Sequence, residues 1–120
     1  MAAKDDLGRA GEARAAQHLA LTGYEVVDRN WRCPDGELDL VAVRGREIVV
    51  VEVKTRRGDG YGDPLEAVDS RKRARLWQLA QRWRREHPQQ ASGRMLRLDV
   101  IGITGADPRS ARLVHLEDIW

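Results

Sequence analysis

The architecture of this protein follows from residues 36–54, which read GELDLVAVRGREIVVVEVK. Two runs rich in valine and isoleucine are joined at residues 44–47, and a glycine inside that joint is typical of a β-hairpin. With a two-residue or a four-residue loop, Val43 lies opposite Ile48, and side chains alternate between the two faces of the sheet. A three-residue loop would turn one strand over, so the loop length decides which side chains meet.

Charged side chains gather at the open end of this hairpin. The favoured register places Asp39 opposite Glu52 on one face, with Lys54 beside Glu52 and opposite Glu37. Two opposed carboxylates repel each other by about 1 kcal/mol, and a bound cation or a shared proton is the usual relief. We therefore expect Asp39 and Glu52 to hold Mg²⁺ or Mn²⁺, with Lys54 as a cationic neighbour.

The alternative is a charged fringe where the strand leaves the core, and such fringes are common. Residues 48–51 are wholly apolar, which is typical of a central strand that is buried on both faces. Charge directly after such a strand needs a physical reason, which favours a site over a fringe.

Length and composition indicate one α/β domain over residues 1–120. A chain of 120 residues buries about two-thirds of its unfolded surface, which is enough for a true core. No apolar run is long enough to span a membrane, and the N-terminus lacks the core of a signal peptide. Cys33 is the single cysteine, which excludes an intramolecular disulfide and favours the cytoplasm. The net charge of +2 is too small to indicate a partner.

A helix is predicted over residues 5–22, with Gly23 as its C-cap. Its stripe of small and apolar residues consists of Gly8, Glu12, Ala15, Ala16, Leu19 and Ala20. Glu12 is the exception in that stripe. It is either a half-exposed residue favoured by the helix dipole or a third carboxylate aimed at Asp39 and Glu52, and the spacing leaves both open.

The other elements follow from turn residues and periodicity. We predict a strand over 24–31, a turn at 33–36, a helical turn at 64–68, a helix from 69 or 70 to about 87, a polar loop at 89–93, and strands over 94–104 and 111–116. Short connections then give a mixed sheet of about five strands with a helix on each face. The three histidines show no ligand spacing and are interpreted as structural or solvated.

The helix after residue 69 carries an unusually basic surface. Its core stripe is Leu76, Leu79, Ala80 and Trp83, and Lys72 extends this stripe over the sheet. Its remaining surface carries Arg71, Arg73, Arg75, Arg82, Arg84 and Arg85. A face of one sign favours a polyanion, and arginine suits phosphate. Trp77 is either a packing residue or an exposed stacking group.

The loop after Lys54 is rich in glycine and basic residues. Arg56, Arg57 and Tyr61 would follow a phosphate backbone and stack on a base, whereas the alternative is a plain surface loop. Its place beside the carboxylates favours the binding role. The residues predicted to contact nucleic acid are Arg56, Arg57, Tyr61, Lys72, Arg73 and Arg75.

The order of these elements and motifs resembles the PD-(D/E)XK nuclease superfamily, and within it the uncharacterised YraN-like family, which is similar to archaeal Holliday-junction resolvases. The resemblance covers nearly the whole chain, and its carriers are residues 8–12 (GRAGE), 29–32 (RNWR), 36–41 (GELDLV), 51–56 (VEVKTR) and 66–68 (EAV) with Lys72. Leu38 stands where the proline that names the superfamily is found.

The resemblance implies a restriction-endonuclease-like fold and a nuclease site. It implies that Asp39, Glu52 and the carbonyl of Val53 hold the metal, that Lys54 acts on the attacking water and on transition-state charge, and that Glu12 is the acid carried by the first helix. We therefore expect Mg²⁺-dependent hydrolysis of DNA phosphodiesters, including branched DNA. The alternatives are a non-catalytic nucleic-acid-binding module, an enzyme acting on RNA or on a protein-presented substrate, and a purely structural protein. A symmetric homodimer would suit a junction, in which two strands are cut.

Overall fold

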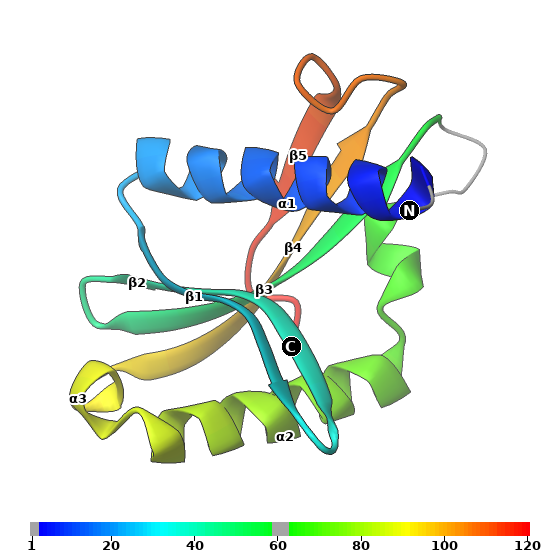
Figure 1. Ribbon diagram of the computed structural model, residues 1–120. Coiled ribbons are helices and arrows are strands. Elements are labelled where there is room, and N and C mark those ends of the chain that lie inside the picture. The colour runs from blue at the N-terminus through cyan, green and yellow to red at the C-terminus, as the bar shows by residue number, and fades with distance from the viewer. Residues whose placement is uncertain (1–2, 59–62) are drawn as a thin grey trace.

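The computed structural model describes residues 3–58 and 63–120 (Figure 1). The elements are α1 (Ala3–Leu21), β1 (Glu25–Cys33), β2 (Gly36–Arg44), β3 (Glu47–Arg56), the 3₁₀ helix η2 (Pro64–Ala67), α2 (Ser70–Glu86), α3 (Pro88–Ala91), β4 (Met95–Thr104) and β5 (Arg112–Leu116). One sheet has the order β1-β2-β3-β4-β5, in which only β3 and β4 run parallel. The predicted α/β domain with a mixed five-stranded sheet is confirmed, and it is consistent with a restriction-endonuclease-like fold.

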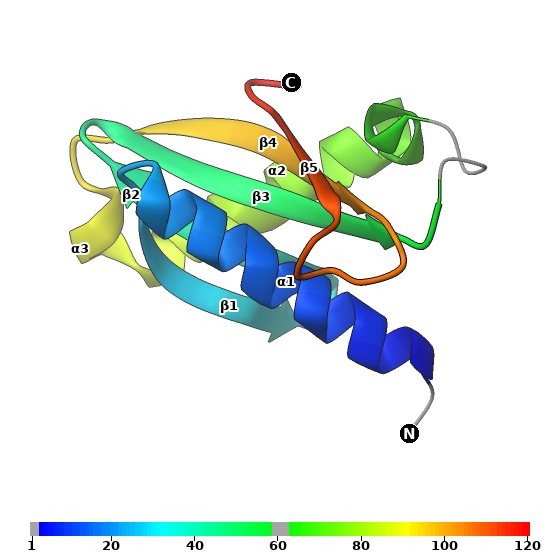
Figure 2. The same cartoon turned by 90° about the horizontal axis from the view of Figure 1, so that it is seen from above.

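Strand β3 is the centre of the molecule and is buried on both faces. Ile48 and Val50 pack with α2 on one side, whereas Val49 and Val51 pack with α1 on the other. The helices accordingly cover opposite faces of the sheet (Figure 2). This arrangement explains why the sequence shows a continuous apolar run rather than an alternating strand.

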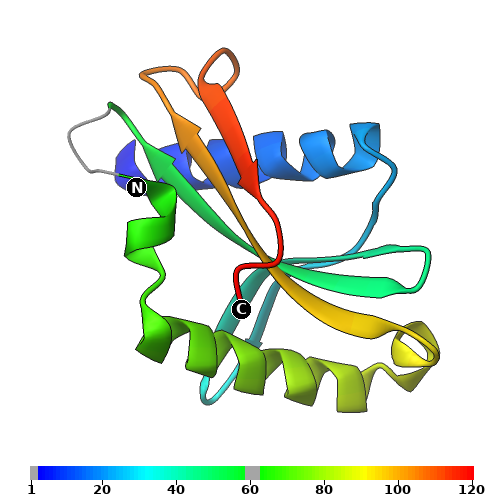
Figure 3. The ribbon, with the colours of Figure 1, turned by 180° about the vertical axis from the view of Figure 1, so that it is seen from behind.

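The β1–β2 hairpin separates from β3 at Leu40. Pairing between β2 and β3 runs from Arg44–Glu47 to Leu40–Val51 and ends there, whereas β1 and β2 stay paired as far as Cys33–Gly36. The hairpin end turns toward α2 while β3 continues past α1 (Figure 1, Figure 3). We call this divergence of β2 and β3 the fork.

The fork corrects one part of the predicted register. The pairing of Val43 with Ile48 is confirmed, but the ladder ends before the expected backbone pairs of Asp39 with Glu52 and of Glu37 with Lys54. Glu37 instead forms an ion pair with Arg32 on β1, at 3.1 Å. Because the sheet twists and opens here, the two carboxylates lie at the branch point of the fork rather than within a regular ladder.

Helix α2 begins as predicted and is followed by a second short helix. The Asp69 side chain caps α2 by accepting a hydrogen bond from the Lys72 amide at 2.8 Å. The predicted polar loop at 89–93 is wrong in its first half, because Pro88 opens α3 rather than only ending α2. Proline is well suited to a first helical position, where its missing N–H costs no hydrogen bond.

Helix α1 contacts β3 closely through Gly11. A Cβ atom on Gly11 would lie 1.8 Å from Oγ1 of Thr55, so only glycine permits this approach without a shift. Ala15, Ala16 and Leu19 are buried as predicted, whereas Ala20 is exposed. The contact at Gly11 positions the next residue, Glu12, on the side of the fork.

A candidate metal and nucleic-acid site at the fork

The side chain of Asp39 takes the place of a backbone hydrogen bond that β2 and β3 no longer form where they diverge. Its Oδ2 accepts a hydrogen bond from the amide of Val53 at 2.9 Å. Where two strands diverge, their backbone groups lose their partners, and a buried donor needs a replacement acceptor. Asp39 supplies that acceptor for β3 and thereby remains half-buried at the branch point.

Glu52 is the buried charge of the site. Only 7% of the residue is exposed, and two lysine ammonium groups approach its Oε2. Nζ of Lys72 from α2 lies at 3.2 Å, and Nζ of Lys54 from β3 lies at 3.6 Å. A buried carboxylate requires such partners because desolvation otherwise favours its neutral form.

The electrostatics of the fork favour added positive charge. Burial, followed by the charges of Glu52 and Glu12, raises the pKa of Asp39 from 3.8 to about 7, against the opposing hydrogen bond from Val53. Burial also raises the pKa of Glu12, where a hydrogen bond from Asn30 opposes the shift and the charges of Glu37 and Glu52 add to it. The charges of Glu52 and Glu12 therefore lie close enough to Asp39 to disfavour its ionisation.

Asp39 and Glu52 are the two side chains of the fork that the sequence predicts as metal ligands. Within the described ranges 3–58 and 63–120, no three His, Cys, Asp or Glu side chains are close enough together to hold one metal ion. The charge of Glu12 acts on the pKa of Asp39, and its role as an acid carried by the first helix stays a prediction. The carbonyl of Val53 as a further ligand stays a prediction.

The residues predicted to contact nucleic acid lie in different places. Lys72 forms an ion pair with Glu52 in the fork. Nε of Arg73 donates a hydrogen bond to the carbonyl of Val68 at 3.0 Å. Arg57 and Arg75 are exposed. Arg56 is half-buried at the end of β3, and Tyr61 lies outside the described residues.

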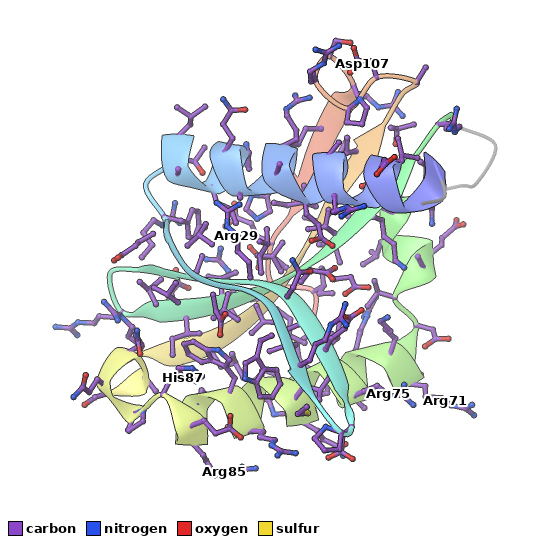
Figure 4. All side chains as sticks on the ribbon, in the orientation of Figure 1. Arg29, Arg71, Arg75, Arg85, His87 and Asp107 are labelled. Atoms are coloured by element: carbon purple, nitrogen blue, oxygen red, sulfur yellow. The ribbon has the colours of Figure 1, made fainter. Side chains whose placement is uncertain are left out.

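The basic surface of α2 is less uniform than its sequence indicated. Arg82 is paired with Glu86 at 3.0 Å and with Asp35 at 3.5 Å. Arg84 donates to the side chain of Gln81. The arginines Arg71, Arg75 and Arg85 are exposed (Figure 4).

One buried polar network was missed by sequence reasoning. Asp99 is almost wholly buried and accepts hydrogen bonds from Arg97 at 2.9 Å and from His115 Nε2 at 2.7 Å. His115 Nδ1 in turn lies 3.0 Å from His18 Nε2, which joins α1 to β5. Burial opposes ionisation of Asp99, but these hydrogen bonds together with one from the Asp118 amide lower its pKa. His18 and His115 thus form structural hydrogen bonds, whereas the sequence left open whether the histidines are structural or solvated.

Two further residues could not be assigned from the pattern. Asn30 adopts a left-handed backbone conformation with φ of 51°, which is uncommon for a non-glycine residue, and neither periodicity nor turn chemistry signals it within a strand. Trp77 stacks on Trp120 with ring centroids 4.8 Å apart, so it is a packing residue. A contact with the distant Trp120 leaves no local trace in the sequence.

A family model described as "Uncharacterised protein family UPF0102" matches residues 11–103, a range that contains every fork residue described above. The chain belongs to this family. UPF0102 proteins of Paenarthrobacter aurescens and Frankia casuarinae are each 50% identical to it, over 119 and 116 residues. Those alignments cover 99% and 97% of this chain, and 97% of each relative. A UPF0102 protein of Acidothermus cellulolyticus is 59% identical over 85 residues, which are 71% of this chain and 64% of that protein.

Membership in UPF0102 confirms the predicted resemblance to the YraN-like family. Among the described residues, no helix is long and apolar enough to cross a membrane.

Proposed function

We propose that this UPF0102 protein hydrolyses phosphodiester bonds of nucleic acid, with DNA as the favoured substrate, at the fork between β2 and β3. The observation that carries the proposal is the pairing of half-buried Asp39 and buried Glu52 at one branch point, with two lysine ammonium groups on Glu52. A buried carboxylate costs free energy, and a cluster of such a carboxylate with partly exposed lysines is typical of sites that act on charged substrates.

The donor set fits a hard divalent cation. Carboxylate oxygens are the ligands that Mg²⁺ and Mn²⁺ prefer, and a cation would stabilise the ionised form of Asp39 that Glu52 disfavours. Asp39 and Glu52 would hold the metal, together with the carbonyl of Val53. When bound, the metal supplies positive charge to the phosphate oxygens and lowers the pKa of water.

Of the other fork residues, the two lysines would act on the substrate directly, whereas Glu12 would act through Asp39. Lys54 would orient the attacking water and stabilise negative charge on the phosphate, and Lys72 would add a second positive charge from α2. Glu12 would keep the pKa of Asp39 high through its own charge. Arg57 and Arg75, both exposed, would contact neighbouring phosphates, as would Arg56 at the end of β3, and Tyr61, which lies outside the described residues, would stack on a base.

The test is hydrolysis of labelled substrates by the purified protein with Mg²⁺ or Mn²⁺. Single-stranded, duplex and four-way-junction forms of DNA and of RNA would be compared, because the fork itself does not distinguish them. Cleavage by the wild-type protein, lost in Asp39→Asn and in Lys54→Ala but kept in the half-buried control Asp107→Asn on the turn between β4 and β5, is the expected result. Calorimetry of Mn²⁺ binding to the wild-type protein and to Asp39→Asn measures the metal site independently.

A non-catalytic nucleic-acid-binding module is the second candidate. The lysine contacts to Glu52 favour it, because they already neutralise the buried charge without a metal. This candidate predicts DNA binding that is the same with and without Mg²⁺ and unchanged in Lys54→Ala. The absence of Mn²⁺ binding to the wild-type protein, with DNA present, would decide in its favour. For either activity we propose a cytoplasmic location. Cleavage of both strands of one junction would further need two copies of the protein, which a homodimer would supply.

A further inference from the structure

One face of α2 carries a regular stripe of long polar side chains. Arg71, Arg75, Gln78, Arg82 and Arg85 are spaced by four, three, four and three residues, which places them in one row along the helix. Figure 4 shows Arg71 and Arg75 at one end of α2 and Arg85 near the other, with Arg71 and Arg85 directed away from the sheet. Four of the five residues in this row are cationic.

The part of the row from Arg75 to Arg85 forms one wall of a groove. Across from this wall, Asp35 of the turn between β1 and β2 lines the groove, which has a volume of about 370 Å³. It is lined by Asp35, Arg75, Gln78, Leu79, Arg82 and Arg85. We call it the α2 groove. Its floor is Leu79, a core residue of α2, and its rim is mainly basic.

A single acidic side chain spans the α2 groove. Oδ2 of Asp35 lies 3.5 Å from a guanidinium nitrogen of Arg82, and the Asp35 side chain is 79% exposed. Glu86 holds the other edge of the same guanidinium at 3.0 Å. Asp35 therefore places a carboxylate where an external anion would meet Arg82.

We propose that the α2 groove binds the phosphate backbone of a duplex arm, and that Asp35 occupies Arg82 until a phosphate displaces it. This inference rests on the proposed function, since the arm belongs to the nucleic acid that the fork would cleave. The row begins at Arg71, next to Lys72, and Lys72 contacts Glu52 in the fork. A strand held along α2 would thus continue to the fork.

Dimensions and chemistry favour a duplex over a single strand. At a rise of about 1.5 Å per residue, Arg71 and Arg85 are separated by about 21 Å along the helix axis. That distance matches roughly six phosphates of one strand in a double helix. No aromatic side chain is present in the described lining, so the groove offers contacts to phosphates but no stacking platform for unpaired bases.

If a phosphate displaces Asp35 from Arg82, removal of the Asp35 charge should raise the affinity of the α2 groove for a duplex. Asp35 competes with phosphate for the same guanidinium, and exposed ion pairs of this kind are weak. Removing the competitor in Asp35→Asn is expected to tighten duplex binding about two- to fivefold. Asp107→Asn is the matched control, because Asp107 also pairs with an arginine on the surface but lies far from α2 (Figure 4).

The experiment is fluorescence anisotropy with a labelled duplex of 20 base pairs and with one of its strands. EDTA prevents cleavage, and the salt concentration is varied. Arg75→Ala and Arg85→Ala are each expected to weaken duplex binding and to lower the slope of log K against log salt by about 0.9, the value for one phosphate contact. Arg109→Ala, which removes an 89% exposed arginine elsewhere, is expected to leave the slope unchanged.

Three results would overturn the inference. They are an unchanged slope in both Arg75→Ala and Arg85→Ala, weaker binding by Asp35→Asn, and tighter binding of the single strand than of the duplex. Thermal melts of each variant show whether it is folded. Cleavage assays separate the two proposals. Cleavage with unchanged salt slopes would reject duplex binding by the α2 groove but support hydrolysis at the fork. Changed salt slopes without cleavage would support binding by the groove but reject hydrolysis.

Discussion

Asp39 lies half-buried at the fork, where burial first and the charge of Glu52 second raise its pKa from 3.8 to about 7. Between these two values the folded protein binds more protons than the unfolded chain, so stability falls as the pH rises through that window. Above pH 7 the full loss of folding stability from the ionised Asp39 carboxylate is present, and below pH 4 this loss is absent. Without metal, Asp39 is thus a destabilising residue, as polar residues at functional sites often are.

Replacing Asp39 by asparagine should therefore stabilise the metal-free protein. Asn keeps an oxygen that can accept the hydrogen bond from Val53 and removes the charge next to Glu52. We expect Asp39→Asn to gain on the order of 2 kcal/mol at pH 8 and nothing at pH 4. Urea unfolding in EDTA at pH 8, 6 and 4 measures this. A variant less stable than wild type at pH 8 would show that the fork does not disfavour the Asp39 charge.

Lys72 should matter for hydrolysis as much as Lys54 does. Its ammonium is the nearer of the two to Glu52, at 3.2 Å against 3.6 Å, although it comes from a different element. Loss of one preorganised cation from a buried site typically costs about 10²-fold in rate. We expect that loss in kcat for Lys72→Ala, with partial recovery in Lys72→Arg.

The matched control for Lys72 is Arg109→Ala, which removes one exposed positive charge far from the fork. Steady-state kinetics on one DNA substrate compares the variants. If Lys72→Ala raised KM with kcat unchanged, Lys72 would bind substrate without acting on the reacting phosphate, as its sequence position on a basic helix first indicated.

At the scale of elements, one contact that positions α1 on the sheet lies at Gly11. Gly11 meets Thr55 so closely that an added Cβ would lie 1.8 Å from its Oγ1, whereas Gly8 has nothing within 4 Å of an added Cβ. The two glycines therefore form a matched pair. Gly11→Ala should destabilise the protein by about 1–3 kcal/mol through overpacking and displace Glu12. Gly8→Ala should stabilise it by up to about 1 kcal/mol through helix propensity.

Chemical denaturation of both glycine variants tests this contrast. Equal effects of the two alanines would mean that α1 does not lie against β3 as described. Because Glu12 follows Gly11 directly, Gly11→Ala should also lower any hydrolytic activity more than its stability loss explains.

The other end of α1 is joined to β5 through His18 and His115. The hydrogen bond between Nε2 of His18 and Nδ1 of His115 needs one ring to accept, while Nε2 of His115 donates to Asp99. Burial first, and then the nearby charges of His115 and Arg14, lower the pKa of His18 below 6.5. A lowered pKa means that the unfolded chain binds more protons, so this contribution is present above pH 6.5 and is lost as the pH falls through the folded-state pKa.

Replacing His18 by glutamine should remove that pH dependence. The stability difference between wild type and His18→Gln is expected to shrink, or to reverse in favour of the variant, between pH 8 and pH 5. Comparing the two proteins at each pH cancels the opposite trend of Asp39. Thermal melts across this range measure the difference, and a constant gap would show that His18 does not titrate in the folded protein.

At the scale of the whole molecule, the sequence predicted what local patterns encode. The order of elements, the Val43–Ile48 register and the core stripe of α2 follow from periodicity and turn residues, which act over a few positions. The fork did not follow, because it depends on where two strands stop pairing. That point is set by sheet twist and by packing of the hairpin end against α2.

Contacts between distant segments were predictable only in part. Lys72 was expected over the sheet from helical spacing, but its distance to Glu52 depends on how far α2 lies from β3. The chain His18–His115–Asp99 joins residues 16 and 97 positions apart, and neither spacing has a local signature. Asp35 was interpreted only as a turn residue, since nothing in a Pro-Asp-Gly sequence indicates that Arg82 lies across the groove.

Metal binding should be measurable as a gain in stability of the entire domain. A ligand that binds only the folded state stabilises it by RT ln(1 + [L]/Kd), which is about 1.4 kcal/mol at ten times Kd. For a domain of this size, that corresponds to a rise in Tm of about 5 °C. Mn²⁺ should produce this shift in the wild-type protein at pH 8, and a smaller one at pH 6, because Asp39 with a pKa of about 7 must lose its proton to bind metal.

Asp39→Asn should start from a higher Tm and gain nothing from Mn²⁺, because the substitution removes both the unfavourable charge and a ligand. Asp107→Asn should respond to Mn²⁺ as the wild-type protein does, since Asp107 lies on the turn between β4 and β5. Differential scanning calorimetry of the three proteins at both pH values gives the answer without a substrate. An equal Mn²⁺ shift in all three would place metal binding elsewhere on the molecule, and the two carboxylates of the fork would then be left with Lys54 and Lys72 alone as their counter-charges.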